Sequence, residues 1–195
     1  MRLKIKRYDG QRSYWQEFEL EGEGRTLLEL LTEVKEKHDP SLSFRAFCRS
    51  GICGTCGVKV NGVHRLACRT RLYGDATVEP PDYGKLIKDL VVEHEFLAEY
   101  LKKGRVWLHP REVNLPLKPS DLKPLERSYD CILCGLCNFV CPLTPTEPSF
   151  GLPSTFTKGY AKVKDKRNAK PEENLRALAR LNPQLCTHCR SCSLV

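Results

Sequence analysis

The stretch "CRSGICGTCGVKVNGVHRLAC", residues 48–68, decides the fold of the first half of this chain. Its cysteines follow the spacing C-x4-C-x2-C, with a more distant fourth: Cys48, Cys53, Cys56 and Cys68. Four thiolates in this pattern are typical of a plant-type 2Fe-2S cluster. The glycines between them let the loop fold closely around a cage and turn backbone amides toward its sulfurs. Zinc is the weaker interpretation, because structural zinc sites usually combine two C-x2-C pairs.

The residues around this loop predict a small sheet and one helix. Residues 3–8 and 14–20 mix apolar and β-favouring residues and should form a hairpin. Residues 57–60 and 64–68 predict a second hairpin around the turn pair Asn61-Gly62. Segments 76–80 and 86–92 should complete the sheet. A helix over 25–38 would place four apolar side chains on one face: Leu27, Leu28, Leu31 and Val34.

A second cysteine motif, "CILCGLCNFVCP", occupies residues 131–142. Its spacing, C-x2-C-x2-C-x3-C-P, is that of bacterial ferredoxins, in which three cysteines hold one 4Fe-4S cluster and the fourth ligates another. The first three here are Cys131, Cys134 and Cys137, and the fourth is Cys141. The same short spacing returns at residues 186–192. We therefore expect a second 4Fe-4S cluster held by Cys141, Cys186, Cys189 and Cys192.

The number of cysteines is one short of the clusters they predict. One 2Fe-2S and two 4Fe-4S clusters use about twelve thiolates, whereas the chain has 11 cysteines. The ligand that the Cys131 group lacks would stand immediately after Val195. We expect that the chain is a piece of a longer protein. Otherwise a partner subunit, water or another residue completes the site, or a 3Fe-4S cluster forms there.

The rest of the sequence predicts an α+β protein with two domains. Residues 1–103 should form the 2Fe-2S domain, and residues 129–195 a helical domain with helices over 154–166 and 171–181. Residues 104–128 join them as a proline-rich connection that is a poor helix and a poor central strand. Four prolines interrupt it: Pro110, Pro116, Pro119 and Pro124.

Composition excludes several classes of function. The formal net charge is +8, but three clusters with about two negative charges each would lower it to about +2. We therefore expect no nucleic-acid partner. Clustered cysteines without a secretory signal argue against a disulfide framework. The sequence carries no dinucleotide-binding, P-loop, zinc-protease or nucleophile-elbow motif, so we expect no catalytic residue on this chain.

Residues 48–70 and 131–142 together resemble the iron-sulfur subunit of succinate dehydrogenase and fumarate reductase, respiratory complex II. The resemblance covers nearly the whole chain and implies a β-grasp 2Fe-2S ferredoxin domain followed by a helical domain like a bacterial ferredoxin. It also implies a hetero-oligomer in which a flavoprotein subunit carries FAD and interconverts succinate and fumarate. Electrons would pass through the clusters to a quinone and membrane anchor subunits, at the cytoplasmic face of the cell membrane.

The third cysteine group departs from the usual family pattern, C-x5-C-x3-C-P, which lacks a middle cysteine and holds a 3Fe-4S cluster. Cys189 fills that gap here. The departure predicts a 4Fe-4S cluster, as in archaeal-type succinate dehydrogenases. It also keeps open an alternative function, the iron-sulfur subunit of a thiol-linked fumarate reductase or heterodisulfide reductase.

Overall fold

The computed structural model describes residues 1–113 and 115–195, and they form two compact units. The second cysteine segment divides between these units, since residues 132–140 group with the N-terminal half of the chain. The first unit comprises Met1–Glu93, Ile132–Val140 and Leu194–Val195, and the second His94–Cys131 and Cys141–Ser193. This division differs from the sequence expectation, which placed residues 132–140 with the C-terminal helices.

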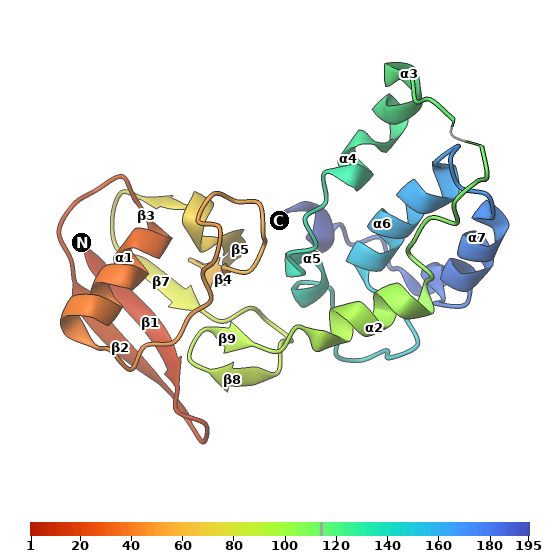
Figure 1. Ribbon diagram of the computed structural model, residues 1–195. Helices are drawn as coiled ribbons and strands as arrows, with labels where there is room; N and C mark the ends of the chain where they lie inside the picture. Colours follow the sequence, from red (N-terminus) through yellow and green to blue (C-terminus); the bar gives the residue numbers. More distant parts are fainter. Residues whose placement is uncertain (114) are drawn as a thin grey trace. The chain divides into compact units, whose positions relative to one another are not determined.

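A five-stranded mixed sheet forms the framework of the first unit (Figure 1). Its strand order is β2-β1-β7-β4-β5, in which β1 and β7 run parallel and the other neighbours antiparallel. Both predicted hairpins are confirmed, because β1 pairs with β2 and β4 with β5. The strands span Arg2–Tyr8 (β1), Ser13–Glu19 (β2), Gly57–Val60 (β4), Val63–Leu66 (β5) and Ala76–Glu79 (β7).

Helix α1, Leu27–Glu33, lies against this sheet and continues as a π-helical turn, Val34–His38 (Figure 1). Thr26 starts it in a capping box: its hydroxyl accepts the Glu29 amide, and the Glu29 carboxylate accepts the Thr26 amide. The predicted apolar face is confirmed as buried. Helix and strands share one hydrophobic core, which includes Leu3, Ile5, Leu27, Leu30, Leu31, Val34, Val58 and Val78.

Residues 86–92 pair with each other rather than with the main sheet, which corrects the sequence expectation for that segment. A buried ion pair nevertheless attaches their turn to β1, because Arg7 Nε donates to Asp89 Oδ1 over 2.8 Å. Asp89 also accepts the Ser43 amide at 2.7 Å. The two small sheets comprise β3 (Arg25–Thr26) with β6 (Arg71–Leu72), and β8 (Leu86–Lys88) with β9 (Val91–Val92).

The second unit is helical. Helices α6 and α7 pack closely enough that a Cβ atom on Gly159 would lie 2.6 Å from the Leu178 side chain. Both helices were predicted, and each has a proline in its first turn. The helices span Glu95–Lys103 (α2), Pro119–Leu122 (α3), Glu126–Tyr129 (α4), Pro153–Lys164 (α6) and Pro171–Ala179 (α7).

Short helical turns occur where the sequence predicted an irregular connection. Helix α3 begins at Pro119, whose missing amide costs nothing at a first helical position, so this proline starts a helix rather than preventing one. Helix α5, Leu136–Phe139, belongs to the first unit. Among the described residues, no helix has the length and apolarity to cross a membrane. The 3-10 turns span Ala67–Arg69, Lys123–Leu125, Pro183–Leu185 and Ser191–Ser193.

Candidate metal centres

The β4–β5 hairpin brings the third and fourth cysteines of the first motif together. Asn61 and Gly62 turn the chain with positive φ angles of 48° and 81°, and Gly57 then stands opposite Leu66 in the ladder. The amide of Ala67 donates to the Cys56 carbonyl at 2.9 Å. As a result the Sγ atoms of Cys56 and Cys68 lie 3.4 Å apart at the open end of the hairpin.

The first two cysteines of the motif form the other half of this site. Cys48 Sγ accepts backbone amides at 3.3–3.4 Å from Ser50, Ile52 and Cys53. The Cys48 amide in turn lies 3.5 Å from Cys53 Sγ. A loop that aims several N–H groups at one sulfur is built to stabilise negative charge there.

The electrostatics of the two halves differ. The amides of Ser50, Cys53 and Ile52 lower the pKa of Cys48 to about 6, so that its thiolate is the favoured form at neutral pH. Burial raises the pKa of Cys56 to about 11. A buried thiol of that kind gives up its proton when a metal binds it, since the metal supplies the missing positive charge.

The two pairs of sulfurs match the ligand set of a 2Fe-2S cluster. Such a cluster takes two protein ligands on each iron. The Cys56–Cys68 pair and the Cys48–Cys53 loop provide this arrangement, and all four cysteines are free thiols. The donor set therefore fits the predicted cluster.

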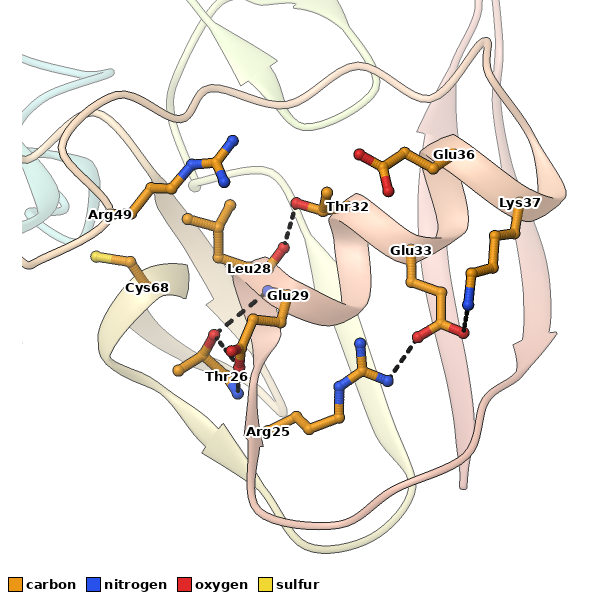
Figure 2. Close-up of a pocket in the computed structure, with 10 residues that line it drawn as sticks. All are labelled: Arg25, Thr26, Leu28, Glu29, Thr32, Glu33, Glu36, Lys37, Arg49 and Cys68. Carbon is orange, nitrogen blue, oxygen red and sulfur yellow. Dashed lines mark hydrogen bonds and ion pairs between the residues drawn. The ribbon is translucent and has the colours of Figure 1, made fainter.

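A shallow hollow of about 430 Å³ opens beside Cys68 along helix α1 (Figure 2). Cys68 and Arg49 stand at one end of it and Lys37 at the other, with the Arg25–Glu33 ion pair on its side. Its walls are largely charged, whereas sites for organic substrates are usually apolar. The lining residues are Arg25, Thr26, Leu28, Glu29, Thr32, Glu33, Glu36, Lys37, Arg49 and Cys68.

The second cysteine segment has an unusual backbone around its middle cysteine. Leu133 and Gly135, on either side of Cys134, adopt left-handed conformations with φ angles of 56° and 78°. A left-handed conformation costs a residue with a side chain about 1–2 kcal/mol. Such alternating conformations turn successive amides toward one point and form the anion-binding nests found at many iron-sulfur sites.

The third cysteine segment repeats this backbone. His188 and Arg190 flank Cys189 with φ angles of 57° and 62°, although neither is a glycine. In both copies, the residues immediately before and after the middle cysteine are therefore left-handed. The repeated conformation gives Cys189 the same local geometry as Cys134.

The thiols of the third segment lie near the last cysteine of the second. Burial raises the pKa of Cys192, and the neighbouring thiols of Cys141 and Cys186 raise it further. Cys141 is buried, whereas Cys186 and Cys189 are exposed. A hydrogen bond with Ser191 lowers the pKa of Cys189. Within the second unit, Cys141 and Cys186 therefore act electrostatically on Cys192.

Comparison with known proteins agrees with these features. Residues 2–99 match the family described as 2Fe-2S iron-sulfur cluster binding domain. The succinate dehydrogenase iron-sulfur subunit of Coxiella burnetii is 34% identical over 207 residues, covering 98% of this chain and 86% of that protein. The chain belongs to the succinate dehydrogenase/fumarate reductase iron-sulfur subunit family.

Other members of this family are longer than the chain. The 8-methylmenaquinol:fumarate reductase iron-sulfur subunit of Wolinella succinogenes is 29% identical, and the match covers 99% of this chain and 66% of that protein. The chain spans 58–66% of the first four curated relatives it matches. A chain of the Mycobacterium smegmatis Sdh1 complex shares the fold, with a TM-score of 0.87, 21% identity, and coverage of 100% of this chain and 86% of that one.

Sequence reasoning named the candidate cysteines but not the backbone conformation around them. Of the four left-handed residues that flank Cys134 and Cys189, only Gly135 is a residue type that announces a positive φ. Leu133, His188 and Arg190 give no such signal. The position of each residue relative to the middle cysteine is the one clue that could have revealed them.

Proposed function

We propose that this chain is the electron-transfer subunit of a succinate dehydrogenase or fumarate reductase. It would relay electrons between an FAD-containing flavoprotein subunit and a membrane quinone. The observation that carries the proposal is the paired arrangement of Cys48 with Cys53 and Cys56 with Cys68 inside an amide-lined loop. Family membership supports the wider assignment.

The residues that would hold the cofactors are the cysteines predicted from spacing. Each cluster, when bound, supplies reversible one-electron redox chemistry. The 2Fe-2S cluster would be held by Cys48, Cys53, Cys56 and Cys68. One 4Fe-4S cluster would be held by Cys131, Cys134, Cys137 and a fourth ligand that is not one of the cysteines of this chain. The other 4Fe-4S cluster would be held by Cys141, Cys186, Cys189 and Cys192.

The protein's own contribution is to set charge and exposure around each site. Amides directed at Cys48 stabilise negative charge at one end of the first site, and burial of Cys56 and Cys68 excludes water from the other. Hydrogen bonds to sulfur and solvent exposure are both known to tune iron-sulfur potentials. The first site is thus asymmetric, with its more exposed end at Cys48.

The middle position of the third motif supports a 4Fe-4S cluster there. Cys189 stands between two left-handed residues, as Cys134 does in the second motif. A segment that held only three irons would have no need for a thiol at this position. The proximity of Cys141 to Cys192 supports the shared use of Cys141 that bacterial ferredoxin spacing predicts.

Exposed apolar side chains beside the first site support a partner surface. Phe47 is 82% exposed and Ile52 is 70% exposed, and each adjoins a predicted ligand. Contiguous apolar surface, more than a single exposed side chain, marks protein interfaces, and these two side chains belong to the same cysteine loop. We infer that the flavoprotein covers them, in a hetero-oligomer that anchor subunits hold at the cytoplasmic face of the membrane. The same proposal includes a β-grasp domain at 1–103, a connection at 104–128 and a ferredoxin-like helical domain at 129–195.

Anaerobic purification of the complex tests this proposal. We expect about ten irons and as many sulfides for each copy of the chain. Succinate should reduce the clusters, as followed by EPR, and a quinone analogue should reoxidise them. Zinc in place of iron, or clusters that succinate and reduced quinone analogues both leave unchanged, would reject it.

Cys189 also favours a second candidate, a soluble thiol-linked fumarate reductase or heterodisulfide reductase component. A complete third group could feed electrons to disulfide chemistry on a partner. The two candidates differ in their electron exchange: the second predicts that a dithiol donor reduces the clusters while quinol analogues do not. The same EPR assay with both donors separates them.

A further inference from the structure

Two glycines of the first cysteine loop lie directly against the second cysteine segment, within the first unit. A Cβ atom added to Gly54 would lie 2.7 Å from both Cα and Cβ of Cys134 and 3.1 Å from its amide nitrogen. Most of that obstacle is backbone, which cannot rotate away. Gly54 also has a positive φ of 72°. The chain therefore requires glycine here both for its conformation and for close approach.

A second glycine, three residues further along the chain, makes a similar contact. A Cβ atom on Gly57 would lie 2.7 Å from Cδ2 of Leu136. Leu136 is only 4% exposed, so its side chain has little room to move. Gly57 has no left-handed backbone, and the contact alone explains its lack of a side chain.

We propose that Gly54 and Gly57 are positioning residues that set the electron-transfer distance between the 2Fe-2S cluster and the 4Fe-4S cluster held by Cys134. The proposal rests on the function proposed above. Gly54 lies between Cys53 and Cys56, so its contact joins the ligand loop of one cluster to a ligand of the next. Electron tunnelling falls steeply with distance, and any side chain that separates these segments slows the transfer.

Variants at Gly54 test the proposal, with Gly24→Ala as the matched control. Gly24 lies outside the cysteine loops and has a similar φ of 75°, but a Cβ atom there makes only an ordinary contact of 3.4 Å with the Tyr73 side chain. Both alanines carry the same backbone strain, and only Gly54→Ala pushes on Cys134. The measurement is the magnetic broadening that the reduced 4Fe-4S cluster imposes on the 2Fe-2S EPR signal in the anaerobic complex, with iron and sulfide determined on the same samples.

We expect Gly54→Ala to lose part of this broadening and to slow reduction of the 4Fe-4S cluster, while Gly24→Ala leaves both unchanged. Gly57→Ala should weaken the broadening as well, and Gly57→Ala combined with Leu136→Ala should restore it, because the smaller partner makes room. If Gly54→Ala fails to hold iron, the comparison of Gly57→Ala with the double variant Gly57→Ala and Leu136→Ala tests the proposal instead.

The opposite results are equally clear. Unchanged broadening in iron-replete Gly54→Ala or Gly57→Ala would overturn the positioning role. The positioning role would also be overturned if Gly57→Ala lost iron and the added Leu136→Ala change did not recover it. Gly57 would then be needed for the fold of the first cysteine loop and not for its contact with Leu136. Failure of the underlying function looks different, since succinate and reduced quinone analogues would then leave the clusters of the unaltered complex unchanged.

Discussion

At the scale of single residues, the cysteine sites depend on backbone shape as much as on sulfur. Leu133, His188 and Arg190 adopt conformations that their side chains disfavour. Such conformations persist only where the surrounding structure enforces them, and they concentrate at functional sites. Their shared placement beside the middle cysteine points to amides directed at a common anion.

Cys189 gives the most direct test at this scale. We expect Cys189→Ser to convert the third cluster from 4Fe-4S to 3Fe-4S, because the segment would lose one soft ligand and keep the rest. EPR of the oxidised variant complex should then show a 3Fe-4S signal that the unaltered complex lacks. Ser191→Ala, two residues away, is the control and should leave the cluster type unchanged. A variant that keeps its 4Fe-4S signal would contradict the assigned ligand.

A buried histidine makes stability depend on pH. Burial lowers the pKa of His64 below its usual value, although nearby Asp82 acts in the opposite direction. Its Nε2 accepts the Asp82 amide at 3.0 Å, which the neutral ring alone can do. The unfolded chain therefore takes up the proton more readily than the folded chain. The free energy of unfolding should fall as the pH drops below about 6.5.

Urea denaturation of the purified protein between about pH 8 and pH 5 measures this effect. His64→Gln removes the titrating group and should flatten the part of the pH dependence that His64 causes. Iron loss at acid pH affects both proteins alike, so the difference between them isolates the histidine. Parallel pH profiles would show that His64 does not titrate on unfolding in this range.

At the scale of elements, helix α1 and the β4–β5 hairpin hold the first site in place. Thr70 O accepts the Leu27 amide at 2.7 Å, so the start of the helix is bonded to the segment that follows Cys68. The capping box at Thr26 fixes that start. A stable start of helix α1 should therefore also help to keep Cys68 in its position.

Thr26→Ala should lower the free energy of unfolding by about 1 kcal/mol, the usual value of a lost threonine cap. Thr32→Ala is the matched control, because the Thr32 hydroxyl donates to the Leu28 carbonyl inside the same helix and alanine is a better helix former. Chemical denaturation followed by circular dichroism gives both values. Equal losses in the two variants would assign the effect to threonine burial and not to the cap.

Local patterns predicted these elements well. Alternation and the Asn61-Gly62 pair predicted both hairpins, and the leucine spacing predicted helix α1, because local residue choice and final packing agree there. Helix α2 was not predicted, and the pairing of residues 86–92 was wrong because the Arg7–Asp89 ion pair, 82 residues apart, holds that turn. The grouping of residues 132–140 with the first unit depends on Gly54 and Gly57, whose contacts no local pattern reveals.

At the scale of the whole molecule, charge links the sequence to its cofactors. The formal net charge of +8 counts every thiol as neutral. Cluster assembly replaces these thiols with thiolate cages that carry about two negative charges each. If the chain holds the three clusters proposed above, much of its positive charge balances the cofactors.

Anaerobic isoelectric focusing checks this balance. The cluster-loaded protein should focus at a clearly lower pH than the same protein after iron has been chelated away, since loading removes about six positive charges from the net total. Refilling the protein with iron and sulfide should restore the lower value. Identical focusing positions would contradict the predicted number of clusters.

The central claim is that three cysteine segments hold one 2Fe-2S and two 4Fe-4S clusters in one electron path. An EPR redox titration of the anaerobically purified complex tests it most directly. The claim predicts one 2Fe-2S signal and two interacting 4Fe-4S signals that appear on reduction, with no 3Fe-4S signal in the oxidised state. A 3Fe-4S signal in the oxidised complex, or a 2Fe-2S signal alone at every potential, would contradict it.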